Sequence, residues 1–231
     1  NHDWFSGVRL TDYPMSFNYL GQRIKSFWQD RRMAWNADGL LVMCPAHRSR
    51  VAAAHGLPLS RVFEMPSEVD VDFYGALPLR RAARRRIVYA GACFKNKGLD
   101  LILEALPDVF KRYPDLEVEL YGNMVKRQSN WLMEALLNVS EYGLVRMKGR
   151  VSKERLRAEF SSSDLLVSAS RFEGSPRAVR EALASGCPAL LSLIPGHIGL
   201  DPDETYIDFV KDEDVHSWSK AMISCLDRSD A

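Results

Sequence analysis

Three features that would assign a protein to a class at once are missing from this sequence of 231 residues. No apolar run approaches the roughly 20 residues that cross a bilayer as a helix, and no charged-then-apolar leader opens the chain. The 31 basic and 30 acidic residues nearly cancel, which gives no case for a nucleic-acid partner. Any electrostatic function must therefore come from local clusters of charge.

Cysteine is also scarce, and its spacing excludes the common metal motifs. The four cysteines stand at positions 44, 93, 187 and 225, without a Cys-x-x-Cys pair or a histidine at zinc-ligand spacing. We expect reduced core thiols, no metal site, no cofactor and a cytoplasmic protein.

What the sequence has is a regular alternation of strands and helices from residue 87 onward. Short β-branched or apolar runs end in glycine-bearing turns and are followed by amphipathic helical patterns. Strands are predicted at 86–92, 116–122, 144–151, 164–170, 187–193 and 205–210, and helices at 99–113, 130–143, 152–163 and 214–227, with a further helix opened by a Gly-Ser-Pro turn at 174–176. This order predicts an α/β fold with a Rossmann-like, doubly wound parallel sheet.

Residues 1–79 follow the same logic less regularly. Helices are predicted at 16–37 and 46–56, and strands at 38–45 and 60–66, which is about half of a Rossmann-type domain. We therefore predict a partial second Rossmann-like domain at 1–79, an arginine-rich linker at 80–86 and a complete domain at 87–231.

The linker lies within the arginine-rich stretch "PLRRAARRR" at 78–86. A solvated interdomain linker is the ordinary interpretation of such a run. Contact with an anionic membrane surface or a phosphate is the alternative.

One turn has the chemistry of an anion site. In "AGACFKNKG" (90–98), a strand ends at Gly91 and a helix begins just after Lys97. Glycine lets the backbone approach a ligand, and a helix N-terminus favours anions through its dipole and free N–H groups. The pattern fits a diphosphate site, although a lysine at a helix start is also a common surface residue.

A second turn carries two carboxylates. In "RFEGSPRAVREALASG" (171–186), Ser175 is a suitable N-cap and Pro176 a suitable first helical residue. Gly174 would let the backbone pass close to a ligand, with Glu173 before the turn and Glu181 inside the helix. Sugar hydroxyls would donate to such carboxylates. By themselves, the two glutamates could equally be a loop residue and a solvated helix residue.

The segment "EGSPRAVREALASGCPAL" resembles the E-x7-E signature of the retaining, group-one (family 4-like) glycosyltransferases of the GT-B fold. Similar family segments are "VYAGACFKNKGLDLILEAL", "LYGNM", "KGRVSKERLRAEFSSSDLLVSAS" and "DFVKDEDVHSWSKAMISCL". Upstream, "NHDWF" resembles the family's His-Asp motif, and the stretch through "PSEVDVDFYG" resembles the end of its acceptor domain. The resemblance covers nearly the whole chain and implies that the first strands of an acceptor domain are absent.

The resemblance also implies roles for individual residues. Glu173 would bind the donor sugar, Glu181 the ribose hydroxyls, and Lys97 the departing diphosphate. His2 would face the donor sugar from the other domain, unless it is simply a surface residue. The remaining implied contacts with the donor are Gly91, Lys95, Gly122, Asn123, Arg150, Val151, Gly174, Ser175, Pro176 and Arg177.

This sequence departs from the family pattern at Ala92, where the family has a phosphate-binding arginine. Lys95 could replace that charge.

The predicted function is retaining transfer of a sugar from a nucleotide-sugar, such as a UDP- or GDP-sugar, to an unknown glycan or lipid-linked acceptor, as in cell-surface polysaccharide synthesis. The alternative is a catalytically silent module that binds nucleotide-sugar or a partner; an epimerase acting on nucleotide-sugars is a further one. Peripheral contact with the inner membrane face and an oligomer covering an unpaired sheet edge are both compatible with the sequence.

Overall fold

The computed structural model describes residues 28–65, 67–78, 84–123, 129–198, 200 and 205–228. The chain divides into two compact units. The N-terminal unit contains the described residues up to Ser67 together with Phe172–Ser175, and the C-terminal unit contains the described residues of Glu68–Arg171 and Pro176–Ala231. Each unit is described by itself.

The C-terminal unit is built on a parallel sheet with the strand order β5-β4-β3-β6-β7-β8. Its strands are β3 (Arg86–Ala90), β4 (Glu117–Tyr121), β5 (Leu144–Gly149), β6 (Leu165–Ser168), β7 (Ala189–Ser192) and β8 (Ile207–Val210). From β3 the chain adds β4 and then β5 on one side of the sheet, and it then returns to form β6 on the other side of β3. The space between β3 and β6 is therefore the topological switch point, where ligands bind in such sheets.

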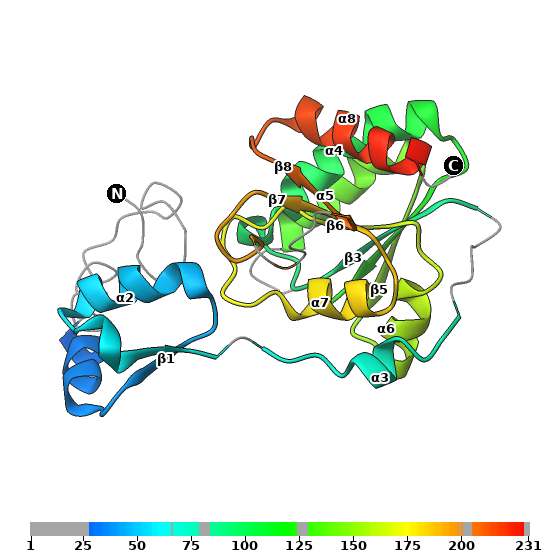
Figure 1. The fold of residues 1–231 in the computed structure, drawn as a ribbon. Coiled ribbons are helices and arrows are strands. Elements are labelled where there is room, and N and C mark those ends of the chain that lie inside the picture. Colours follow the sequence, from blue (N-terminus) through cyan, green and yellow to red (C-terminus); the bar gives the residue numbers. More distant parts are fainter. Residues whose placement is uncertain are drawn as a thin grey trace. The chain divides into compact units, whose positions relative to one another are not determined.

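Helices cover both faces of this sheet (Figure 1). One face carries α4 (Leu99–Arg112), α5 (Ser129–Ser140) and α8 (Val215–Arg228), and the other carries α3 (Val71–Tyr74), α6 (Lys153–Phe160) and α7 (Arg177–Ala184). Two hydrophobic clusters match these layers. Ile102, Leu106 and Trp218 belong to the first, and Phe160 and Val179 belong to the second. The two-sided burial explains why β6 and β7 are almost entirely apolar rather than alternating.

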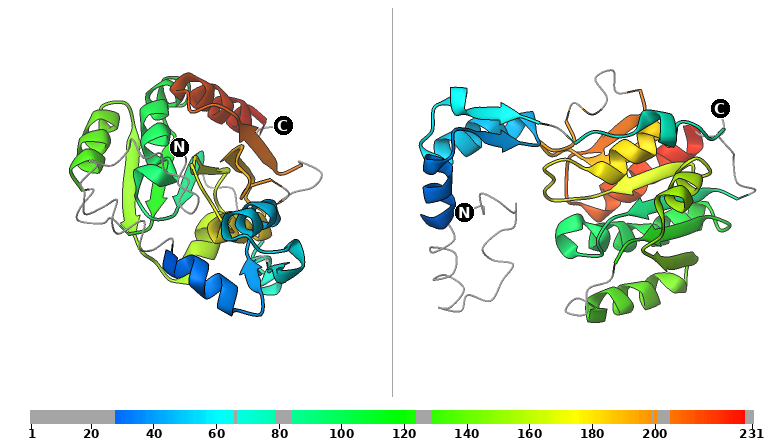
Figure 2. Two further views of the ribbon diagram at one scale, coloured as in Figure 1. Left: turned by 90° about the vertical axis from the view of Figure 1, so that its left-hand side faces the viewer. Right: turned by 90° about the horizontal axis from the view of Figure 1, so that it is seen from below.

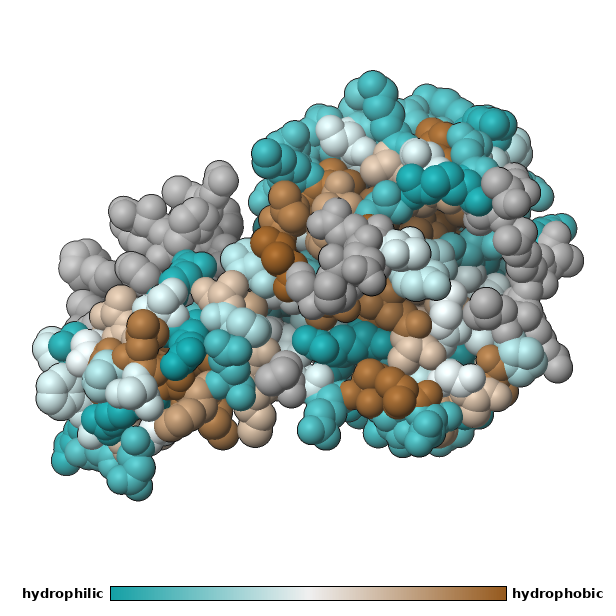
Figure 3. Space-filling model, in the orientation of Figure 1, coloured by the Kyte–Doolittle hydropathy of each residue, from teal (hydrophilic) through white to brown (hydrophobic). Residues whose placement is uncertain are grey.

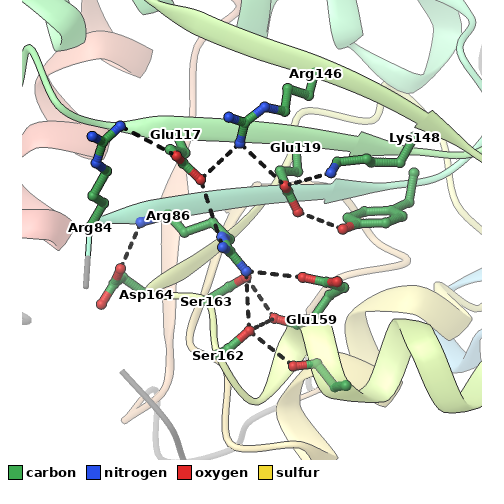
Figure 4. Close-up of polar contacts among 12 residues, drawn as sticks. Arg84, Arg86, Glu117, Glu119, Arg146, Lys148, Glu159, Ser162, Ser163 and Asp164 are labelled. Atoms are coloured by element: carbon green, nitrogen blue, oxygen red, sulfur yellow. Dashed lines mark hydrogen bonds and ion pairs between the residues drawn. The ribbon is translucent and has the colours of Figure 1, made fainter. Parts of the chain in front are cut away.

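Charged residues replace apolar ones on one face of β3, β4 and β5 (Figure 4). Glu119 of β4 is only 3% exposed, and its carboxylate accepts a hydrogen bond of 2.5 Å from Tyr121 and lies 3.0 Å from Lys148 Nζ. Glu159 of α6, equally buried, lies 3.0 Å from Arg86 Nη1. Because each buried carboxylate has a cation or hydroxyl partner, the network tolerates burial.

The N-terminal unit has a small core. Residues 28–36 are helical, and β1 (Leu40–Val42) pairs in parallel with β2 (Val62–Glu64) beside α2 (Arg48–His55). Val42, Ala52 and Val62 form the buried cluster. The alternate strand residues Leu41 and Phe63 are 61% and 53% exposed. Figure 3 shows hydrophobic residues at the surface of both units.

The predicted α/β fold with a parallel sheet is confirmed. Predicted strands and helices from residue 86 onward correspond to β3–β8 and α4–α8, with ends that differ by a few residues. In the N-terminal region, the predicted strands at 38–45 and 60–66 are shorter, and only the end of the predicted helix at 16–37 lies in the described residues.

The region around the predicted linker differs from the sequence prediction. The short helix α3 was not predicted, and residues 68–78 group with the C-terminal unit although the sequence places them before a boundary at residue 79. Arg86 is the first residue of β3, so it is not part of a linker. Arg84 pairs with Glu117, and the Arg85 guanidinium lies 4.5 Å from the centre of the Tyr113 ring. Residues 79–83 lie outside the described residues.

All four cysteines lie in the described residues, and none forms a disulfide. Cys44, Cys93 and Cys187 are buried and Cys225 is half-buried. Burial raises the pKa of the Cys93 and Cys187 thiols, and raises that of Cys225 to about 12 with a contribution from Asp208. Among the described residues, no helix has the length and hydropathy of a membrane span, and no three potential ligands of a metal ion gather in one place.

Candidate functional site

Three glycine turns meet at the carboxyl ends of β3, β4 and β5. Gly91 N–H donates to Tyr121 O at 2.9 Å, and Gly122 N–H donates to Gly149 O at 2.9 Å. Gly122 has φ of 144°, and a Cβ there would collide with the Gly91 carbonyl oxygen. Only glycine permits this approach, because the conformation and the space both exclude a side chain. The three turns therefore form one continuous backbone surface at the end of the sheet.

Two hydrogen bonds hold the turn after β3 in place. The Tyr89 hydroxyl donates to Ala92 O at 2.7 Å, and Cys93 N–H donates to Asn123 O at 3.1 Å. Asn123 thus has a backbone role in addition to any predicted contact with a ligand. Ala92 itself carries no charge, so an anion at this turn would meet backbone groups here.

The N-terminus of α4 lies at the switch point. Gly98 caps the helix with φ of 68°, and a Cβ there would collide with the carbonyl of Ala169, just after β6. Lys97 precedes this cap and is half-buried. A helix of 14 residues with a lysine at its start concentrates positive potential at its first turn.

Arg171 joins the two sides of the switch point. Its guanidinium donates to both oxygens of Asp100 in α4, at 2.9 and 3.1 Å, and its Nε donates to Glu213 at 3.1 Å. Arg171 also donates to the backbone oxygens of Lys95 and Asn96. Burial opposes the charge on Arg171, but the two carboxylates outweigh it and raise its pKa. The sequence prediction missed Arg171, although the residue directly follows the strand predicted at 164–170 and precedes the Glu173 turn.

Lys95 is directed elsewhere. Its Nζ lies 5.6 Å from the centre of the Trp131 ring in α5. It lines a cavity of about 430 Å³ between α4 and α5, together with Asp100, Glu104 and Tyr142. Compensation for the missing arginine by Lys95 stays a prediction, and in this arrangement its ammonium lies against the aromatic ring.

The helix that follows the Gly-Ser-Pro turn begins one residue later than predicted. Pro176 is the N-cap and Arg177 the first residue of α7. The prediction that Ser175 caps the helix is wrong, because its side chain makes no capping hydrogen bond. Its hydroxyl instead accepts a hydrogen bond of 3.2 Å from Ser67 N–H. Ser67 and Ser175 both belong to the N-terminal unit. At Gly174 a Cβ would meet no atom within 4 Å, so local packing does not require a glycine.

Glu181 lies in α7 with its side chain 13% exposed, and Arg177 Nη2 lies 3.8 Å from its Oε1. Glu181 also lies beside Tyr74 of α3, whose hydroxyl it influences electrostatically. Burial raises the pKa of Tyr74 to about 12, with Glu181 adding to the effect.

The structure places the other predicted site residues as follows. Arg150 is exposed and Val151 packs against the second hydrophobic cluster, both just after β5. Glu173, Gly174 and Ser175 group with the N-terminal unit, whereas Lys97, Arg177 and Glu181 belong to the C-terminal unit. His2 lies outside the described residues. The structure therefore brings together the three glycine turns and places the start of α4 at the same end of the sheet, while the roles assigned to these residues stay predictions.

Solved structures of glycosyltransferases share this fold. HepE of Anabaena in complex with UDP-glucose superimposes with a TM-score of 0.77 at 14% identity, covering 89% of this chain and 59% of that protein. WaaG, a glycosyltransferase involved in lipopolysaccharide biosynthesis, gives a TM-score of 0.71 at 16% identity over 83% of this chain and 54% of its own. The fold is thus the Rossmann-like fold of GT-B glycosyltransferases.

The chain belongs to the family of group 1 glycosyl transferases, whose model matches residues 84–228. A curated relative is the GDP-mannose-dependent alpha-(1-6)-phosphatidylinositol monomannoside mannosyltransferase of Mycolicibacterium smegmatis. It is 28% identical over 194 residues, which are 77% of this chain and 49% of that protein. Mannosylfructose-phosphate synthase of Agrobacterium fabrum is 25% identical over 84% of this chain and 46% of its own. The chain spans about half the length of these relatives.

Proposed function

We propose that this chain takes part in transferring a sugar from a nucleotide-sugar donor to an acceptor, with retention of anomeric configuration. The observation that carries the proposal is the continuous surface of Gly91, Gly122 and Gly149 beside the N-terminus of α4. Exposed backbone at the carboxyl ends of parallel strands, next to a helix N-terminus, suits a diphosphate. Membership of the group 1 family supports the assignment.

In the proposed complex, Lys97 and the start of α4 neutralise the diphosphate as the bond to the sugar breaks. Glu181 accepts hydrogen bonds from the ribose hydroxyls, and the backbone from Gly174 to Arg177 contacts sugar and phosphate. Arg150 and Val151 lie near the base. Glu173 and His2 are assigned to the donor sugar. The E-x7-E spacing and retention come from the family resemblance.

The named relatives guide the choice of donor and acceptor. One is GDP-mannose-dependent and is named for a phosphatidylinositol monomannoside, and HepE was solved with UDP-glucose. We propose a GDP- or UDP-sugar as donor and a glycan or lipid-linked acceptor, with the chain in the cytoplasm or at the inner membrane face.

A second candidate is a module that binds nucleotide-sugar without transferring the sugar. The exposed side chains of Leu41 and Phe63 in the N-terminal unit favour it, since apolar surface of this kind is often covered by a partner. In that case the chain acts in an assembly.

Titration of UDP-, GDP- and dTDP-sugars by calorimetry, followed by assays for hydrolysis and transfer, separates these candidates. Binding with turnover supports the transferase. Binding without turnover supports the silent module, and the absence of binding to every nucleotide-sugar overturns both.

A further inference from the structure

Tyr74 is a nearly fully buried residue outside the predicted site, and its hydroxyl has no hydrogen-bond partner among the described residues. Only 3% of the Tyr74 surface is exposed. A buried hydroxyl without a partner costs free energy, so a partner for this hydroxyl is expected close by.

The local structure holds Tyr74 firmly in place. Asp70 caps α3 by accepting a hydrogen bond of 2.9 Å from Phe73 N–H. Arg157 of α6 donates to Phe73 O at 2.7 Å, and its guanidinium lies 4.3 Å from the centre of the Phe73 ring. The short helix is therefore fixed at its start and along its length.

The end of α3 lies against α7, where Glu181 is located (Figure 2, right). A Cβ on Gly75 would lie 2.9 Å from Val71 O and 3.4 Å from Ala184 O. The tight contact is with Val71 O of α3 itself, and the distance to Ala184 O is that of ordinary van der Waals contact, so the end of α3 packs directly against α7.

The Tyr74 hydroxyl lies close enough to the Glu181 carboxylate to interact with it as a hydrogen-bond donor, but the contact falls outside regular hydrogen-bond geometry. On the carboxylate itself, Arg177 Nη2 lies 3.8 Å from Oε1, which is also too long for a hydrogen bond. A regular hydrogen bond between the two groups would satisfy both the hydroxyl and one carboxylate oxygen.

We propose that Tyr74 is a positioning residue for nucleotide binding: its hydroxyl donates to Glu181 and fixes the carboxylate in the orientation that accepts the ribose hydroxyls. The proposal rests on the proposed function of Glu181. Because Tyr74 is buried, it acts through Glu181 rather than by touching the nucleotide.

The test compares UDP and GDP with their 2′,3′-dideoxy counterparts by calorimetry, using the intact chain, Tyr74→Phe, Glu181→Gln and the double variant. The intact chain should prefer whichever ribonucleotide it binds over the dideoxy form. Tyr74→Phe should reduce that preference by about three- to tenfold, the effect of losing one hydrogen bond of ordinary net strength. In the Glu181→Gln background, Tyr74→Phe should change the preference less than twofold, since the two residues act as one unit.

Tyr113→Phe is the matched control. Tyr113 directly follows α4 and is a core tyrosine, 4% exposed. Its hydroxyl donates to Asp227 of α8. Its loss should lower thermal stability and leave the ribose preference unchanged. Melting curves identify any unfolded variant, and the double-variant comparison keeps the test decisive if Tyr74→Phe is less stable.

The outcomes separate the inference from the function on which it rests. If Glu181→Gln abolishes the ribose preference and Tyr74→Phe retains it in full, the role of Tyr74 is overturned and the proposed function stands. If the intact chain shows no ribose preference at all, the assignment of Glu181 is overturned as well.

Discussion

Arg171 and Asp100 form a bidentate ion pair across the switch point of the sheet, with hydrogen bonds of 2.9 and 3.1 Å. The two residues are 71 positions apart in sequence. The pair joins the loop after β6 to the first turn of α4, so it fixes the helix N-terminus proposed to bind the diphosphate. The planar fork of arginine matches a carboxylate in a way that lysine does not.

Arg171→Lys should therefore lower the free energy of unfolding by about 1.5–3 kcal/mol, the range for hydrogen bonds to charged groups. It should also weaken nucleotide binding, because the start of α4 loses a fixed position. Urea unfolding and calorimetry measure the two effects. Arg112→Lys is the control, since its pair with Asp227 is exposed and should change stability by less than about 1 kcal/mol. Equal effects at both positions would contradict the structural role of Arg171.

The glycine turns give a second prediction about stability. Gly122→Ala should cost about 3 kcal/mol or more, because it adds backbone strain and a collision with the Gly91 carbonyl. Gly149→Ala is the comparison: φ is 70° there, but a Cβ would meet nothing within 4 Å, so only about 1–2 kcal/mol of left-handed strain is expected. Denaturant midpoints measure the difference, and a smaller cost at Gly122 than at Gly149 would refute the close contact of the turns.

Gly174 offers a test of ligand approach that is independent of packing. Its Cβ position is open and no positive φ requires glycine there, so Gly174→Ala should leave the melting temperature unchanged. If a donor passes close to this backbone, the added methyl group should weaken nucleotide-sugar binding. Unchanged affinity would remove Gly174 from the proposed site.

The buried carboxylate of Glu119 gives a pH prediction. Burial alone would raise its pKa, but hydrogen bonds from Tyr121 and Lys148 outweigh burial and lower it. A lowered pKa in the folded state adds stability above the unfolded value of about 4.5, and this stability is lost as the pH falls through the folded value. Glu119→Gln should therefore flatten the loss of stability between neutral and acidic pH, as measured by unfolding at a series of pH values. A slope as steep as that of the parent would show that the network does not carry this linkage.

Local sequence patterns were sufficient to predict β3–β8 and α4–α8, because each strand is a short run rich in apolar or β-branched residues and each helix shows an amphipathic pattern. The order of these elements also predicted the parallel sheet. Helix α3 was missed because four residues show no periodicity. Its signals were Asp70 as an N-cap and Gly75 after its last residue.

The site was only partly predictable for a different reason. The turn glycines could be predicted from residue type alone, because each of them stands at or near the end of a predicted strand. The partners of Arg171 come from distant parts of the chain, so no spacing rule brings them together. Ser175 was a reasonable N-cap by type, but its hydroxyl is engaged by Ser67 N–H. Hydrogen bonds to residues far away in the sequence determine where the Arg171 and Ser175 side chains lie.

The central claim is that Glu181 binds the nucleotide and Glu173 the transferring sugar. The most direct measurement is a calorimetric titration of Glu181→Ala and Glu173→Ala with the nucleotide-sugar that the intact chain binds, paired with a transfer assay. Glu181→Ala should weaken nucleotide binding by about 1–3 kcal/mol, and Glu173→Ala should mainly reduce transfer. Two variants that bind and transfer like the parent would contradict the account.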